Sequence, residues 1–360
     1  MNETDANIDG LRAGLIATVQ TARAAERDVL AALDPGIRDV PAAGGGWSPK
    51  DVQAHLNAWK GRTVDRLRAL RIGANEPIEV ETDEANAKFH AERVAWSWPQ
   101  VVADADASTD ELVAEIEAAP DETLALPRIS GTIMGNGSEH TLTHLTPIAA
   151  AAGLYSRTLE LADEITAIID RGGWPARAAA YARYNLACFH ALSGNLDAAE
   201  EAARQAIELQ ERAMSGTEGL LIVGAHSRLG YVHYLRGNYD AAYAEFRREL
   251  EWVNTSDHAL RERTVIELHQ KISAVHHARR EDADAIRFGD LAIHAHARRV
   301  AAGADDPATR YYIAAVYARR GDVEHTREHL ALPMSRLPQF TRWRLERDID
   351  FAGVRDQLLA

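Results

Sequence analysis

Apolar residues recur three to four positions apart along most of this chain of 360 residues, which is the spacing of amphipathic helices. The first stripe lies in residues 8–33 and consists of Ile8, Leu11, Leu15, Val19, Ala22 and Val29. It ends at Asp34-Pro35-Gly36, a sequence that favours a helix stop, and a loop with three glycines follows at 44–46. The pattern predicts a first long helix and a break after it.

Two further long helices follow from start and stop residues. Ser48 as N-cap and Pro49 at the first helical position open a second helix, which is expected to stop at Gly73. A short helix is expected at 84–95, and a third long helix ends before Pro120. The spacing of apolar residues within each helix predicts one buried face on each.

The fourth helix of this half carries two histidines. It is expected to begin after a loop at 120–130, to include His140 and His144, and to continue to about Asp170. Pro147 lies inside it and predicts a kink, because proline removes one backbone hydrogen bond and crowds the preceding turn. Four long amphipathic helices in about 165 residues predict a four-helix bundle.

The second half of the chain contains an internal repeat. Residues 186–199 align with 229–242 at an offset of 43, a third copy follows at 272–285, and a fourth lies at 313–323 with an offset of 41. Each copy has a large residue followed by a small one, and a turn about eight positions later. Four copies of a helix–turn–helix unit predict an α-solenoid, and the tail 331–360 is expected to form a capping helix.

Composition agrees with an all-α protein of two domains, a bundle in 1–168 and a repeat domain in 169–360. The net charge is −14, of which residues 1–150 contribute −11 (13 basic, 24 acidic), so a general nucleic-acid binder is excluded. Cys188 is the single cysteine, which excludes an intrachain disulfide and suits a reducing compartment. Neither a signal peptide nor a membrane span is recognisable, and we expect a cytoplasmic protein without a membrane partner.

Histidine is the residue type that could carry chemistry, with 15 copies in the chain. His140 and His144 are four residues apart, so their imidazoles share one helix face and can share a metal ion. His325 and His329 have the same spacing, and we interpret them as solvated or capping residues. Spacing alone is therefore a weak signal.

The motifs around the first pair are more specific. The sequence reads G-W-S-P-K-D at 46–51, A-H-L-N-A-W at 54–59, D-E-A-N-A-K-F-H-A-E-R at 83–93 and N-G-S-E-H-T-L-T-H at 136–144. This combination resembles the DinB-like four-helix-bundle superfamily, and specifically its ClbS/DfsB branch, over about residues 8–165.

The resemblance implies a metal site and leaves two alternatives. In the wider superfamily one histidine on the second helix and a pair on the fourth bind a divalent metal, commonly zinc or nickel, which implies His55, His140 and His144 here. Three imidazoles with an open fourth position suit a catalytic site. Members of the ClbS/DfsB branch need not bind metal and are associated with hydrolytic resistance to a reactive genotoxin. A metal-free polar pocket and a purely structural bundle therefore stay open.

Other residues would line such a pocket. Trp59 lies one turn after His55 and Trp96 precedes the third long helix, and packing in the core is the alternative role for both indoles. Glu139 is one residue off the face of His140, as expected of a group beside the site or in solvent rather than a ligand. The ligand would be a small molecule, and no catalytic residue is identified.

The repeats resemble the tetratricopeptide repeat (TPR) over about residues 174–330, with a longer period than the 34-residue consensus. His190, His233 and His276 recur at the position where a tyrosine packs in the TPR, and are interpreted as packing residues. The residues expected to face a concave groove are Tyr184, Ser227, Tyr231, Tyr234, Gln270, His277 and Tyr311. This groove looks aromatic and nearly neutral and predicts a protein or peptide partner.

Two functions follow from these resemblances. The first is a small-molecule-binding bundle that acts as a metal-dependent hydrolase or thiol transferase in detoxification or self-resistance, coupled to a TPR interaction domain. The second is a non-catalytic TPR scaffold or regulatory protein with a degenerate bundle. The sequence leaves the substrate, the metal, the partner and a homodimer open.

Overall fold

The computed structural model describes residues 8–40, 47–75, 82–171, 174, 176–215, 224–255 and 261–360. These residues contain helices and helical turns and no strand, so the all-α fold is confirmed. The glycines at 44–46 lie outside the described residues. The described chain divides into two compact units, one with residues 8–40 and 47–182 and one with 183–215 and 224–360. Helix α9 has residues in both units, and the domain boundary at 168 stays a prediction.

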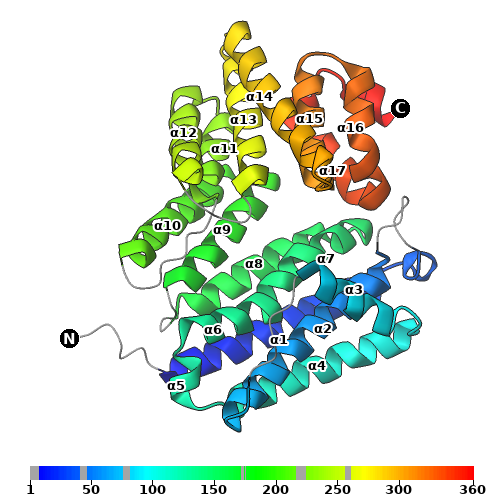
Figure 1. Cartoon of the computed structure of the whole chain (residues 1–360), viewed down its shortest axis with the longest axis vertical. Helices are drawn as coiled ribbons and strands as arrows, with labels where there is room; N and C mark the ends of the chain where they lie inside the picture. The colour runs from blue at the N-terminus through cyan, green and yellow to red at the C-terminus, as the bar shows by residue number, and fades with distance from the viewer. Residues whose placement is uncertain are drawn as a thin grey trace. The chain divides into compact units, whose positions relative to one another are not determined.

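The first unit is a helical bundle. Its elements are α1 (Ile8–Ala32), η1 (Pro35–Ile37), α2 (Pro49–Arg71), α3 (Thr82–Arg93), α4 (Trp98–Ala118), α5 (Asp121–Leu124), α6 (Pro127–Met134), η2 (Gly135–Glu139), α7 (His140–Ala151) and α8 (Tyr155–Ile169). Helices α1, α2, α4 and the continuous arm of α6, η2 and α7 form the four-helix bundle (Figure 1). Helix α8 packs on α1 and α7, and α3 packs on α2.

The predicted core face and helix starts are confirmed. Leu15, Val19 and Ala22 of the α1 stripe are fully buried. Ser48 caps α2 by accepting a hydrogen bond from the Asp51 backbone N–H, and the Asp51 carboxylate accepts one from the Ser48 backbone N–H. These reciprocal bonds fix where α2 begins and hence where its later residues point.

The fourth helix differs from the prediction in two places. The segment 120–130, expected as a loop, contains α5 and the start of α6. A single helix to Asp170 is wrong, because the chain turns between α7 and α8 at Gly153, whose φ is 73°. Only glycine adopts this left-handed conformation at low cost, so α7 ends there and α8 begins as a separate helix. Pro147 lies inside α7.

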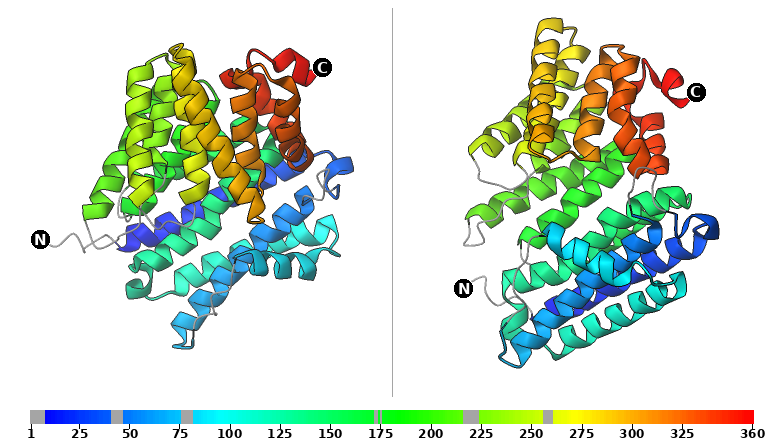
Figure 2. Two further views of the ribbon diagram at one scale, coloured as in Figure 1. Left: turned by 45° about the horizontal axis from the view of Figure 1, so that its top comes forward. Right: turned by 45° about the vertical axis from the view of Figure 1, so that its right-hand side comes forward.

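The second unit consists of helical hairpins, and the first helix of the first hairpin, α9, begins in the first unit. The hairpins are α9 (Ala176–Leu192) with α10 (Leu196–Ser215), α11 (Ala225–Leu235) with α12 (Tyr239–Thr255), α13 (Arg261–Ala278) with α14 (Asp282–Ala301), and α15 (Pro307–Arg319) with α16 (Val323–Arg336). The last three hairpins are shown from two further directions in Figure 2. Four such hairpins confirm the predicted TPR-like repeat architecture.

The turns inside the hairpins recur at the predicted register. The left-handed residue is Gly194, Gly237, Arg280 or Gly321, with φ of 81°, 78°, 62° and 73°. Gly230 shows why small residues follow large ones: a Cβ atom added there would lie 2.7 Å from the ring of Phe246. The two helices of a hairpin therefore cross at a separation that excludes a larger side chain.

The C-terminal tail differs from the predicted capping helix. Residues 331–336 complete α16, and then α17 (Pro338–Arg347), the short turn η3 (Ile349–Phe351) and α18 (Arg355–Leu359) follow. Pro338 starts a new helix because it cannot continue the old one, and the Asp348 side chain caps η3 by accepting from the Asp350 backbone N–H. No helix of the described ranges has the length and apolar character needed to cross a membrane.

Candidate metal centre

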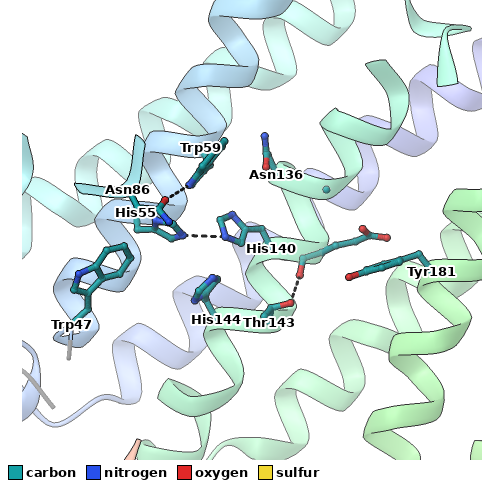
Figure 3. A pocket seen from close by; sticks show the side chains of 11 residues that line it. Trp47, His55, Trp59, Asn86, Asn136, His140, Thr143, His144 and Tyr181 are labelled. Atoms are coloured by element: carbon teal, nitrogen blue, oxygen red, sulfur yellow. Dashed lines mark hydrogen bonds between the residues drawn. The ribbon is translucent and has the colours of Figure 1, made fainter. Parts of the chain in front are cut away.

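Three histidines converge in the bundle. His55 lies in the second turn of α2, whereas His140 and His144 lie one turn apart at the start of α7. Their rings approach edge to face, with centroid separations of 4.7, 5.0 and 4.6 Å, and point toward one another in Figure 3. Helix packing therefore brings together residues that are 85 positions apart in the sequence.

The nitrogen positions fit a shared metal ion. One ring nitrogen of each histidine lies within 4.8 Å of the other two, and the Nε2 atoms of His55 and His140 are 3.0 Å apart. Two imidazoles on a tetrahedral zinc ion, at about 2.05 Å each, place their nitrogens about 3.3 Å apart. The observed separation is close to this value, so a small opening of the cluster would admit an ion.

A π-helical turn, η2, leads into α7 and accommodates the glycines that interrupt the fourth helix. Gly137 lies in this turn, and a Cβ atom added there would lie 2.6 Å from the side chain of Val19 on α1. The absent side chain lets the two helices approach closely. Because α7 then continues as a regular helix, His140 and His144 keep the spacing of a ligand pair.

Burial keeps the three imidazoles neutral. Burial, with a smaller contribution from His144, lowers the pKa of His55 to about 2 and that of His140 to about 3. Burial also lowers the pKa of His144. Neutral imidazoles have the free lone pairs that a metal ion requires, so the cluster is prepared for binding without releasing protons.

Ring packing orients the ligands. The Nδ1 atoms of His55 and His140 are buried and have no hydrogen-bond partner among the described residues. The rings are held by neighbouring indoles, since Trp47 lies 4.8 Å from His55 and Trp59 lies 6.2 Å from His140. Many metal sites instead fix the second nitrogen with a carboxylate or a carbonyl, which would make the imidazole more basic.

The cluster faces a pocket of about 440 Å³ (Figure 3). It is lined by Trp47, His55, Trp59, Asn86, Gly135, Asn136, Glu139, His140, Thr143, His144 and Tyr181. Trp59 and Glu139 lie where the sequence predicted them. Trp96 does not line this pocket, and its ring lies instead under the guanidinium of Arg93, 5.3 Å from the ring centroid. The predicted place of Trp96 is thus corrected by the packing of the α3–α4 connection.

Sequence reasoning missed six lining residues: Trp47, Asn86, Gly135, Asn136, Thr143 and Tyr181. Four of them stand inside the motifs quoted above, which was the available signal: Trp47, Asn86, Asn136 and Thr143. Asn86 accepts a hydrogen bond from the Trp59 indole N–H at 3.0 Å and so orients that ring. Tyr181 lies on α9, far from the motifs in sequence, and no local pattern could have placed it here.

Behind the pocket lies a buried charge cluster. Glu26 of α1 is fully buried. One oxygen of its carboxylate accepts hydrogen bonds from Lys60 of α2 and from the hydroxyl of Thr141, each at 2.8 Å. The other carboxylate oxygen accepts hydrogen bonds from Arg23 at 3.1 Å and from the Gln53 amide at 3.2 Å. The carboxylate therefore ties α1, α2 and α7 together immediately beside His140.

The residues predicted to line a groove on the repeats differ in how exposed their side chains are. Ser227, Tyr234, Gln270 and Tyr311 are buried, and so do not line an open surface. Tyr184 and Tyr231 are half-buried, and His277 is exposed at the end of α13. The surroundings are also more charged than expected of a nearly neutral groove, because Arg228 and Lys271 both pair with Glu267 there.

The fold and the site together define an all-α protein with a histidine cluster in a helical bundle. Residues 18–151, which include all three histidines, match the model of the DinB superfamily, so this segment is a DinB superfamily domain. A solved structure of nearly identical TPR-like repeats from a kinesin light chain of Podosopora anserina covers 58% of this chain and 96% of that chain, at 14% identity and a TM-score of 0.35. A comparison with curated proteins returns no match.

Proposed function

We propose that the bundle is a metal-dependent enzyme that acts on a small molecule, by hydrolysis or thiol transfer. The observation that carries this proposal is the convergence of three neutral imidazoles on a pocket of about 440 Å³. The superfamily match over the same residues supports it, because metal binding is common in DinB domains. Zinc and nickel are the proposed ions, since both accept imidazole ligands.

Each lining residue has a role that its chemistry allows. His55, His140 and His144 would hold the ion through one nitrogen each. A bound ion supplies a Lewis acid with an open coordination position. The indoles of Trp47 and Trp59 provide an apolar wall that orients the small molecule.

Glu139 places a carboxylate in the pocket lining, one residue before the first α7 ligand. We assign it to accept or donate a proton at the bound molecule, since a carboxylate that lines the same pocket is a suitable general acid or base.

The ClbS/DfsB-like motifs support a role in detoxification or self-resistance, with a reactive electrophile as the substrate. A metal-free polar pocket at the same place is the alternative mechanism within this function. Both versions use the same cavity and differ in whether the three histidines bind an ion.

Metal analysis tests the proposal. The purified chain is incubated with zinc or nickel, desalted, and assayed by inductively coupled plasma mass spectrometry, in parallel with His144→Ala and His329→Ala. His329 is a matched control, because it also stands four residues after another histidine but lies in the repeats. We expect about one ion per chain in wild type and His329→Ala and loss in His144→Ala. A wild-type chain without stoichiometric metal would reject the metalloenzyme.

The second candidate is a scaffold or regulator that binds a partner protein through its TPR-like hairpins. The polar contacts on the first helices of these hairpins support it. In a pure scaffold, partner binding would be unchanged by His144→Ala and the chain would not consume an electrophile. The two candidates are compatible, since they use different units.

A further inference from the structure

The chain's own C-terminal tail lies across the first helices of three successive hairpins. Asp350 in η3 accepts a hydrogen bond from the Tyr234 hydroxyl of α11 at 3.0 Å and one from the Gln270 amide of α13 at 2.9 Å. Its carboxylate also pairs with Arg319 of α15 at 2.8 Å. The Asp350 side chain is therefore held by two hydrogen bonds and one ion pair, with one contact from each of three repeats.

These contacts form a built carboxylate site. Tyr234, Gln270 and the Arg319 side chain are 8%, 4% and 5% exposed, and the Asp350 side chain is 8% exposed. A buried ion pair is stable only where further hydrogen bonds satisfy the carboxylate, which the hydroxyl and the amide do here. Arg319 also donates to the Gln270 backbone carbonyl at 3.1 Å, so the guanidinium is oriented by the helices themselves.

A second carboxylate and an aromatic ring of the tail bind beside the first. Asp348 accepts from the Tyr311 hydroxyl at 3.0 Å. Phe351 is fully buried and its ring lies 5.1 Å from that of Tyr311. Ile349 stands between the two aspartates and is 50% exposed. The bound sequence Asp-Ile-Asp-Phe thus inserts residues 348, 350 and 351 and leaves 349 toward solvent.

Charge favours an acidic occupant. Arg228, Arg263 and Lys271 lie around Glu267 on α11 and α13, and Arg319 adds a fourth cation on α15. Without the tail, these five groups would leave an excess of three positive charges on the first helices. An electropositive surface of this kind attracts acidic segments and discriminates against basic ones.

We propose that Tyr234, Gln270, Tyr311 and Arg319 form a recognition site for an acidic segment of a partner protein, and that residues 348–351 occupy this site as a built-in competitor. The partner segment has two carboxylates two residues apart followed by an aromatic residue. The inference rests on the proposed interaction role of the repeats and is independent of the metal site. The tail must leave before the partner binds, so the apparent affinity depends on how firmly the tail is held.

A peptide with the sequence of residues 345–356 provides the probe. It is labelled with fluorescein, and its anisotropy is measured against the full-length wild type and a full-length chain with Asp348→Asn and Asp350→Asn. We expect the variant to bind at least tenfold more tightly, because its own tail no longer competes. Adding Arg319→Met to the variant should abolish binding, as should replacing both aspartates of the peptide by asparagine.

The controls separate a competitor from a permanent part of the core. Leu345, Phe351 and Val354 are buried with Tyr311 and Leu330, so a variant could lose its fold, and far-ultraviolet circular dichroism is recorded for each protein. Hydrogen exchange of the wild type gives an independent readout. Amides of 338–359 should exchange at least tenfold faster than those of α13 if the tail detaches.

Two results would overturn the proposal. One is a folded variant that binds the peptide no more tightly than wild type. The other is equal protection of the tail amides and the α13 amides from hydrogen exchange in the wild type. This second result tests the proposal even if the variant unfolds. His144→Ala, introduced into the double variant, should leave peptide binding unchanged, so failure here and failure of the metal proposal are distinguishable.

Discussion

Replacing Glu26 by glutamine tests whether the buried charge cluster holds the bundle together. The substitution keeps the shape of the side chain and removes its charge. Lys60 is fully buried and pairs with Glu26 at 2.8 Å, so it would lose its counter-ion without gaining access to water. Arg23 would keep its pair with Asp106, so the main penalty falls on one lysine.

The magnitude follows from this geometry. Leaving one buried charge uncompensated costs about 3–5 kcal/mol of unfolding free energy, whereas an exposed pair contributes about 0–1 kcal/mol. For a unit of this size, that loss lowers the Tm by about 6–20 °C. Attraction to Lys60 and Arg23 outweighs burial and keeps the pKa of Glu26 below its usual value, so the charged form is the one that is lost.

Urea unfolding followed by tryptophan fluorescence measures the effect. Five of the seven tryptophans, Trp47, Trp59, Trp96, Trp98 and Trp174, lie in the first unit and report on it. Asp106→Asn is the control, because this carboxylate is 40% exposed and should cost under about 1 kcal/mol. The double variant Glu26→Gln/Lys60→Met should recover most of the loss. A cost below about 1 kcal/mol for Glu26→Gln, or no recovery in the double variant, would refute the reasoning.

Three further predictions concern the repeats. Although burial alone would raise it, the cations beside Glu267 lower its pKa to about 2, from a usual value of 4.5. The charged Glu267 carboxylate therefore stabilises the fold above pH 4.5, and this contribution of about 3 kcal/mol is lost as the pH falls from 4.5 to 2. In Glu267→Gln, the urea concentration at the unfolding midpoint should decrease less between pH 7 and pH 3 than it does in the wild type. Gly230→Ala should lower the free energy of unfolding by about 1–3 kcal/mol, because the added methyl group overpacks against Phe246. Gly131→Ala is the control: no atom lies within 4 Å of the added Cβ, so the substitution should be neutral or stabilising by up to about 1 kcal/mol. Equal effects of the two substitutions in thermal unfolding would contradict this prediction. Arg280→Gly should raise stability by about 1 kcal/mol, because arginine at φ 62° is strained and the residue is exposed, and a lower Tm would count against it.

The repeat architecture was predictable because its signals are local. A left-handed turn residue and a large–small pair recur every 41 to 43 positions, and each acts within one hairpin. At Arg280 the hairpin geometry outweighs the preference of the residue itself, since arginine adopts there the left-handed conformation that glycine has in the other turns. Helix starts such as Ser48 were predictable for the same reason, because a cap acts over three residues.

The errors arose where a signal depended on distant neighbours. The end of α7 at Gly153 was hidden by a sequence that stays apolar through the turn. The prediction of a capping helix at 331–360 is wrong because η3 interrupts the tail, and η3 is held by side chains from α11, α13 and α15. Those contacts span 31 to 116 positions and leave no periodic trace in the sequence.

By itself, the sequence determined the all-α class and the hairpin register, since both depend on helical periodicity and local turns, and its resemblance to the DinB-like superfamily implied the three histidines of the candidate metal centre. Only the tertiary structure decided that His55 meets His140, that Tyr181 completes the pocket, and that Asp350 occupies the site on the repeats. The physical reason is that periodicity specifies which face of a helix is buried, whereas the partner of that face is chosen by packing among helices far apart in the chain.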